Sequence, residues 1–234
     1  MKLNGKTYDK FILNGKTYEK FYLNNKIYQS LDPGLILDLP LQNNFTDYSA
    51  SGISMVAGNA NGFPSFVSDG SGGYALYFNG TKSIKTAVNL PINTSDKVSI
   101  EFDIKTSATA VQMILELSTN AGSNNAFYVT INETLNKTWL LDRNSNLNIV
   151  SSSASVNTGS FVNVKMIIDR SLNGLQQSKI YINGVLSSTQ VSPYTTDNNG
   201  NFGSYPLFIG QRNGNSSGFV GQMKNLKMYN YPIL

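Results

Sequence analysis

Two carboxylates stand two residues apart in the segment EFDIK, at Glu101 and Asp103. Residues two apart in a β-strand point to the same face, so this pair is able to flank one bond. Two carboxylates around a glycosidic bond are what glycoside hydrolysis requires. The alternative is a strand whose polar outer face carries the acids and whose inner face consists of Ile100, Phe102 and Ile104. We favour that structural interpretation.

Candidate sugar-binding residues gather in two polar loops, 190–205 and 212–218. Sugar sites combine aromatic platforms with a few polar groups, and the loops offer Tyr194, Asn199, Phe202, Tyr205 and Asn213. The alternative is that these are ordinary surface loops of an Asn-rich protein. Trp139 lies within a strand-like pattern, and we expect it in the core.

Composition restricts the chemistry further. The 234-residue chain has no histidine, the commonest general base, and no cysteine, so it has neither disulfides nor thiolate metal sites. Hydrophobic residues make up 40% and charged residues 14%, a balance that suits short strands with polar turns. No apolar run is long enough to span a membrane, and the N-terminus does not resemble a signal peptide.

All of the +4 net charge lies in residues 1–30, which hold six lysines against Asp9 and Glu19. The rest of the chain has equal numbers of basic and acidic residues. The lysines recur beside turn residues, where soluble hairpins carry them. We therefore expect a solvated face and no nucleic-acid binding.

The same residues repeat a phrase, LNGKTYDKF, LNGKTYEKF and LNNKIYQS, at a period of ten. Asn-Gly and Asn-Asn are signals of two-residue hairpin turns. With such turns, Phe11 faces Tyr18 in one hairpin, and Lys10 faces Glu19 in that same hairpin. In the next hairpin, Phe21 faces Tyr28. The sequence predicts a small antiparallel meander.

This meander would carry aromatic side chains on both faces, and it is too small to be stable alone. We interpret residues 1–31 as an attachment segment that other chains bury. The alternative is that it packs on the following domain. The segment LDPGL then marks a boundary before a domain at 35–234. The predicted attachment residues are Tyr8, Phe11, Tyr18, Phe21, Tyr22 and Tyr28.

From residue 35 onward, short strand-like runs recur between turn residues, and no helical periodicity is evident. The run FVNVKMIIDR alternates apolar and polar residues, as a half-buried strand does. Many short strands at regular spacing predict an all-β sandwich or barrel. The order YALYFNGTKSI, VSIEFDIKT, FVNVKMIIDR, YINGV, FIGQR and GQMKNLKMYN resembles the laminin-G-like, concanavalin A-like jelly-roll family across 35–234.

The resemblance implies a jelly-roll sandwich, a fold that lectins, glycosidases and adhesion modules share. Laminarinase-type relatives carry a further acid after the pair, where Lys105 or Thr106 stands here, so no enzyme is expected. Relatives often bind calcium, and Asp47 resembles their early acidic ligand. Lys224, however, stands where many of them supply a second acid, so calcium at Asp47 is a weak candidate and no other cofactor is expected.

A repetitive β-segment before a display domain is similar to a bacteriophage virion appendage, such as a head fibre or tail protein. We therefore expect a non-enzymatic structural protein on the virion surface, joined to other virion proteins through residues 1–31. A homo-oligomer is expected, with a trimer as the first guess, and a cell-surface glycan as a candidate ligand. The alternative is a carbohydrate-binding module of a secreted or surface bacterial protein, and a glycosidase comes third.

Overall fold

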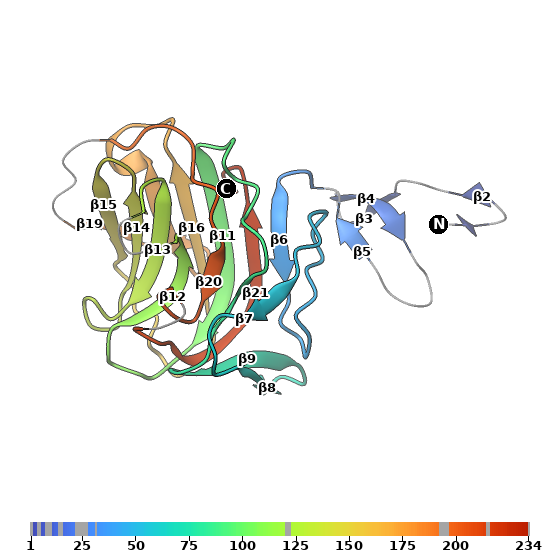
Figure 1. Cartoon of the computed structure of the whole chain (residues 1–234), viewed down its shortest axis with the longest axis horizontal. Coiled ribbons are helices and arrows are strands. Elements are labelled where there is room, and N and C mark those ends of the chain that lie inside the picture. The colour runs from blue at the N-terminus through green and yellow to red at the C-terminus, as the bar shows by residue number, and fades with distance from the viewer. Residues whose placement is uncertain are drawn as a thin grey trace.

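The computed structural model describes residues 2–3, 6–7, 11–13, 16–21, 28–30, 32–119, 123–191, 197–213 and 216–233. From Leu35 onward the described chain forms two antiparallel sheets, and their apolar faces enclose one hydrophobic core (Figure 1). Its one helical element is a short 3₁₀ turn, Gly174–Gln176. No helix in the described part of the chain has the length and apolarity needed to cross a bilayer.

Sheet I has eight strands. Their spatial order is β19 (Ser188–Val191), β15 (Leu147–Ser152), β14 (Thr138–Arg143), β13 (Ala126–Ile131), β12 (Gln112–Leu117), β20 (Leu207–Ile209), β10 (Ile84–Thr86) and β7 (Met55–Ala57).

Sheet II faces sheet I across the core. Its order is β18 (Val185–Leu186), β17 (Ser178–Ile182), β16 (Val162–Asp169), β11 (Lys97–Lys105), β21 (Val220–Tyr229), β9 (Tyr74–Asn79) and β8 (Ser65–Ser68). A further strand, β6 (Leu35–Leu39), pairs with the second half of β21.

The predicted jelly-roll sandwich is confirmed. In β11 and β16 every second residue enters the core, including Phe102 opposite Val164. The hairpin between β17 and β18 turns at Asn183 and Gly184, whose φ angles of 50° and 78° are those that a two-residue turn of this kind requires. After β18 the chain crosses to the other sheet and forms the edge strand β19.

The N-terminal repeat forms short strands in two separate sheets. β1 (Lys2–Leu3) pairs with β2 (Lys6–Thr7), and β3 (Phe11–Leu13), β4 (Lys16–Phe21) and β5 (Tyr28–Ser30) form a three-stranded sheet. The predicted pairings of Phe11 with Tyr18 and of Phe21 with Tyr28 are confirmed. A single continuous meander is not formed by the described residues, since β2 and β3 belong to different sheets.

The boundary segment is a turn, as its Asp-Pro-Gly sequence predicts. The Asp32 carboxylate accepts from the Gly34 N–H at 3.0 Å, and the Asp32 carbonyl accepts from the Leu35 N–H at 3.0 Å. The Tyr231 hydroxyl donates to the same carboxylate. The start of the domain is therefore fixed against the segment that follows its last strand.

Candidate functional site

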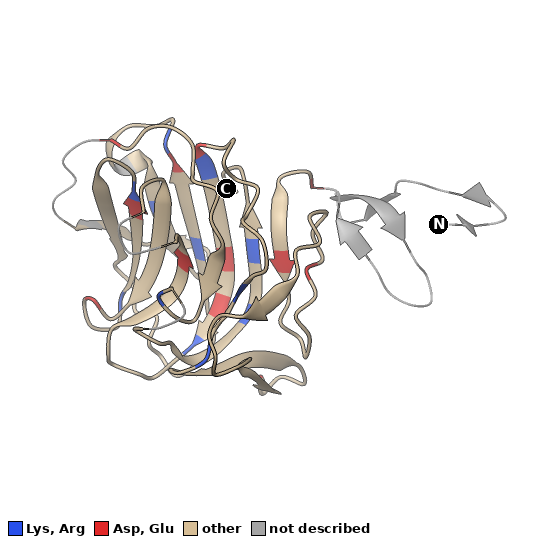
Figure 2. Ribbon diagram, viewed as in Figure 1, with Lys and Arg blue, Asp and Glu red and all other residues tan. Residues whose placement is uncertain are grey.

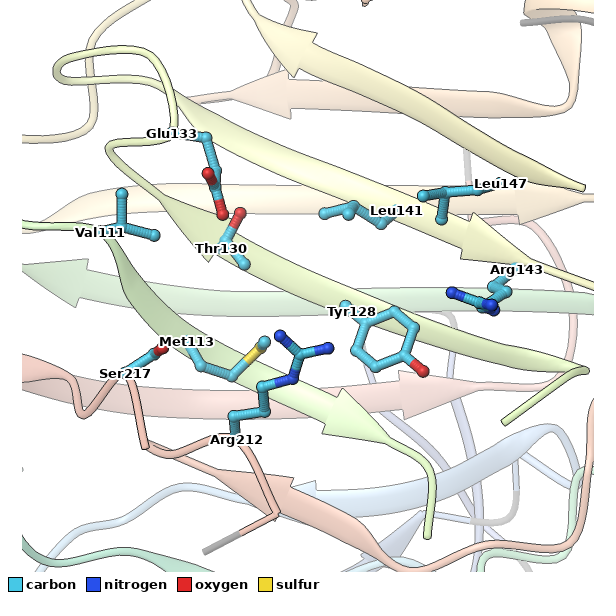
Figure 3. Close-up of a pocket in the computed structure, with 10 residues that line it drawn as sticks. All are labelled: Val111, Met113, Tyr128, Thr130, Glu133, Leu141, Arg143, Leu147, Arg212 and Ser217. Carbon is cyan, nitrogen blue, oxygen red and sulfur yellow. The ribbon is translucent and has the colours of Figure 1, made fainter. Parts of the chain in front are cut away.

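A groove lies on the outward face of sheet I, with a volume of about 110 Å³ (Figure 3). Strands β12, β13 and β14 form its floor, and the segment after β20 forms one wall. Apolar, hydroxyl and charged side chains all contribute to the lining. The lining residues are Val111, Met113, Tyr128, Thr130, Glu133, Leu141, Arg143, Leu147, Arg212 and Ser217.

Strand alternation places the floor residues. In β13, Phe127 and Val129 are fully buried in the core, so Tyr128 and Thr130 point to the opposite face. Tyr128 pairs with Leu141 of β14, and the two side chains pack together with Met113 on the outward face.

Two guanidinium groups flank the tyrosine. The Arg212 guanidinium lies 5.9 Å from the centre of the Tyr128 ring, within the range of a cation–π contact. Arg143 pairs with Ala126 and is therefore a diagonal neighbour of Tyr128 on the same face. Burial and the Glu116 charge raise the pKa of the Tyr128 phenol, and the two arginines act against that shift. The phenol is therefore a neutral hydrogen-bonding group at neutral pH.

Glu116 lies beside this floor and is fully buried. Its carboxylate accepts from the Ser118 hydroxyl at 2.7 Å and from the Asn213 backbone N–H. Burial raises the pKa of Glu116, although these hydrogen bonds and the charge of Arg212 oppose the increase. Glu116 thus fixes the segment that carries Arg212 to the edge of β12.

Two residues of the groove lining carry buried polar atoms without a hydrogen-bond partner among the described residues. Thr130 Oγ1 and Arg212 Nε are buried and make no hydrogen bond to any described residue. The same holds for Nε1 of Trp139, which pairs with Thr130 across β13 and β14. Because most buried polar groups in proteins are paired, these atoms mark positions where a bound molecule would supply the missing partner.

The sequence prediction that Trp139 lies in the core is wrong. Trp139, Leu141 and Arg143 are half-buried on the outward face of β14, whereas Thr138, Leu140 and Asp142 point inward. Asp142 is inside because it pairs with Arg170 at 2.7 Å, and both side chains are fully buried. A pattern based on hydrophobicity alone assigns this strand to the opposite face.

The predicted sugar-binding residues of the loops lie in different environments. Phe202 is 2% exposed and packs edge-on against Phe127, so it belongs to the core and offers no platform to solvent. The Asn199 carbonyl accepts from Asn144 Nδ2 at 2.5 Å, away from the groove lining. Tyr194 lies outside the described residues.

Two of the predicted residues adjoin the groove. Tyr205 packs against the Met113 and Tyr128 cluster and donates its hydroxyl to the Asn124 carbonyl at 2.9 Å. Asn213 follows Arg212 and binds Glu116 through its backbone. The signal that would have located the groove is the register between β13 and β14, which brings Tyr128 and Leu141 together.

Asp47, the weak calcium candidate of the sequence, accepts hydrogen bonds from groups of its own chain. Its Oδ1 accepts from the N–H groups of Asp38 and Ser49, at 2.8 and 2.9 Å. Its Oδ2 accepts from the Ser49 hydroxyl at 2.9 Å and from the Ile53 N–H at 2.7 Å. Four donors occupy the lone pairs that a cation would use. The described residues contain no group of three or more acidic side chains suited to a metal.

Lys224, which stands where relatives supply an acid, is also engaged. Its ammonium group donates to Asp69 Oδ2 at 2.7 Å and lies 4.4 Å from the centre of the Phe161 ring. The hydrogen bond from Lys224, followed by those from Ser71, lowers the pKa of Asp69. A partly buried ion pair thus joins β21 of sheet II to the residue that follows β8.

The Glu101 and Asp103 carboxylates lie on the outward face of sheet II, as expected. Asn163 Nδ2 donates to both, at 3.1 and 2.9 Å, and Asn225 Nδ2 donates to Asp103 at 2.7 Å. Glu101 pairs with Lys165 on one side and Lys227 on the other. Figure 2 shows acidic and basic residues interspersed across these strands. The two acids therefore belong to a cross-strand network of amides and cations.

A second hollow of about 330 Å³ adjoins Glu101, and Asp32, Lys165, Tyr229 and Tyr231 contribute to its lining. Burial, together with the charge of Glu101, raises the pKa of Tyr229 to about 12. Burial and the hydrogen bond to Asp32 also raise the pKa of Tyr231. Both phenols are protonated at neutral pH and act as hydrogen-bonding groups.

Of the six predicted attachment residues, Tyr8 and Tyr22 lie outside the described residues. For Phe11, Tyr18, Phe21 and Tyr28 the structure describes the backbone pairing given above.

Comparison with solved structures identifies related folds. Domain 4 of AbnA, an extracellular arabinanase from Geobacillus stearothermophilus solved with arabinotriose, is 18% identical with a TM-score of 0.60, covering 84% of this chain and 92% of that one. A botulinum neurotoxin type C chain, whose cell entry depends on two ganglioside molecules, is 14% identical with a TM-score of 0.60, covering 86% of this chain. The binding domain of botulinum neurotoxin DC in complex with SialylT is 16% identical with a TM-score of 0.58.

This chain spans about half the length of the neurotoxin chains, 49% in each case. At these identities the likeness shows the fold alone. A search of curated protein sequences found no match. The Laminin_G_3 profile, described as the Concanavalin A-like lectin/glucanases superfamily, matches residues 78–233. With two sheets in jelly-roll arrangement and a family match over most of its length, the chain belongs to the Concanavalin A-like lectin/glucanases superfamily.

Proposed function

We propose that the protein is a non-enzymatic display protein that binds a glycan in the groove of sheet I. The observation that carries this proposal is the groove floor itself. The half-buried Leu141 side chain and the edge of the Tyr128 ring, a residue that is 4% exposed, line the floor beside arginines and unpaired polar atoms. Sugar rings have an apolar face and a polar rim, and this combination of groups complements both.

The size of the groove suits one sugar unit of a longer glycan. Its volume of about 110 Å³ is below the ~300–1,000 Å³ of pockets that enclose small molecules. A saccharide unit would rest on the floor while its neighbours extend along the sheet face. The arabinotriose complex of the similar AbnA domain supports a saccharide as the ligand class.

We also propose that the protein does not catalyse glycoside hydrolysis. Glu101 and Asp103, a carboxylate pair with strand spacing, lie on the other sheet, where Asn163 donates to both. In the groove, Glu116 is fully buried beneath its hydrogen bonds. Neither arrangement presents an acid and a nucleophile across one bond.

The test is binding of the full chain to a glycan array that includes arabinotriose, followed by calorimetry on the best ligand. Tyr128→Ala is expected to weaken binding by about tenfold or more, because an aromatic contact surface is lost. The matched control is Tyr181→Ala on sheet II, where the ring contacts Lys165 at 4.6 Å. Circular dichroism confirms that both variants fold. Absence of any glycan ligand, or equal losses in both variants, would contradict the proposal.

We further propose that residues 1–31 attach the domain to other chains of a phage virion, most simply in a homo-oligomer. The two confirmed hairpin registers support a β-structured segment, and its small size favours burial by a partner. Light scattering of the full chain beside a chain starting at Leu31 tests this. Association of the full chain alone supports attachment. Two equally stable monomers would favour the alternative, a carbohydrate-binding module of a bacterial surface protein.

A further inference from the structure

Arg143 and Arg212 bring two positive charges to the groove, one on each side of Tyr128 (Figure 3). The described ion pairs join Lys97 to Asp169, Arg170 to Asp142 and Lys224 to Asp69, and neither groove arginine takes part in them. Nε of Arg212 is buried without a hydrogen-bond partner among the described residues. A half-buried guanidinium that makes no ion pair is costly, so this part of the groove favours an incoming anion.

The acidic residues nearby do not neutralise the two arginines directly. Glu116 directs its carboxylate oxygens to Ser118 and to the Asn213 backbone. Glu133 is exposed and lies beside Thr130, on the side of the groove away from Arg143 (Figure 3). The groove therefore carries its two cations around Tyr128 and its exposed acid, Glu133, at the end away from Arg143 (Figure 3).

We propose that the groove selects acidic saccharides, with the carboxylate of a uronic or sialic acid unit held between Arg143 and Arg212. This inference rests on the proposed glycan binding and adds its ligand class. Guanidinium groups bind carboxylates through paired, charge-assisted hydrogen bonds, and Tyr128 provides the surface between them. Glu133 repels a second carboxylate, so the unit at that end is neutral.

The test compares ligands that differ in charge. The probes are 3′-sialyllactose with lactose, and trigalacturonic acid with its methyl ester, titrated into the full chain by calorimetry. At least one acidic member is expected to bind about tenfold or more tightly than its neutral partner, and salt should weaken it. Arg143→Gln and Arg212→Gln should each remove this preference.

Lys85→Gln is the matched control. Lys85 lies on the same outward face, against the Phe208 ring at 5.4 Å, but does not line the groove. This variant should keep the preference for acid, and unfolding curves check that all variants are folded. Equal affinity for acidic and neutral members overturns the inference and leaves glycan binding standing. Failure to bind any glycan overturns both, and so does an acid preference that only Lys85→Gln removes, because the site would then lie elsewhere.

Discussion

Arg170 and Asp142 form an ion pair inside the sandwich, with Nη2 and Oδ1 2.7 Å apart and both side chains fully buried. Asn198 Nδ2 also donates to the carboxylate at 3.1 Å, and Arg170 Nη1 donates to the carbonyls of Gly200 and Asn201. The Arg170 guanidinium stacks 4.0 Å from the centre of the Phe202 ring. One pair thus fixes the face that β14 turns inward and the course of the loop 197–202.

Asp142→Ala is expected to lower the free energy of unfolding by about 3–5 kcal/mol, because it leaves a buried guanidinium without its counterion. Urea unfolding measures the loss. Lys97→Met is the control, since Lys97 is 34% exposed and its bond to Asp169 is worth at most about 1 kcal/mol. Equal effects of the two substitutions would show that the Arg170 pair does not support the sandwich.

Asp47→Ala should destabilise the segment 38–53, because four donors lose their acceptor together. The expected loss is about 2 kcal/mol or more, since each abandoned buried donor costs ~1–3 kcal/mol. Asp197→Ala, which removes one acceptor from the Gly174 N–H, should cost less. Thermal unfolding of the wild type should also be the same in calcium and in a chelator. A large stabilisation by calcium would instead identify Asp47 as a candidate ligand.

The ion pair of Asp69 with Lys224 is expected to stabilise the fold at neutral pH and to lose this effect in acid. Because the folded state lowers the pKa of Asp69 from its ordinary 3.8, its contribution to stability is complete above that value. It is lost as the pH falls toward the lowered pKa. The difference in unfolding midpoint between wild type and Asp69→Asn should therefore stay constant from about pH 7 to pH 5 and narrow below about pH 4. A difference that persists unchanged at pH 2.5 would refute this.

Gly218→Ala should destabilise the wall of the groove. A Cβ atom there would overlap the backbone carbonyl of Gly80, which cannot swing aside as a flexible side chain would. We expect a loss of about 3 kcal/mol, the upper end for overpacking. Gly72→Ala is the control for strain alone, since Gly72 has a φ of 93° and open space around it. Its loss should be about 1–2 kcal/mol. A smaller loss for Gly218→Ala would contradict the steric argument.

The fold was predictable because its strongest signals are local. The alternation in FVNVKMIIDR identifies β16, and Asn183-Gly184 fixes a tight turn regardless of the rest of the chain. The cross-strand pairs of the N-terminal repeat were predictable for the same reason, since two-residue turns determine register.

The site was not predictable to the same extent, because it depends on contacts between distant residues. Arg170 draws Asp142 inward from another strand and Phe202 inward from a loop. These contacts turn Trp139 outward and remove Phe202 from the surface. Composition made the loop 190–205 look like a binding loop, but its Phe202 side chain packs in the core.

The position of β21 has a consequence for biosynthesis. Among the described strands it comes last in the chain, and it lies between β11 on one side and β6 and β9 on the other. Sheet II is therefore split into two halves until residues 220–229 have left the ribosome. Until then, nascent chains expose the edges of β9 and β11. A stop codon that removes β21 would leave a product prone to aggregation, even though the groove residues are all present.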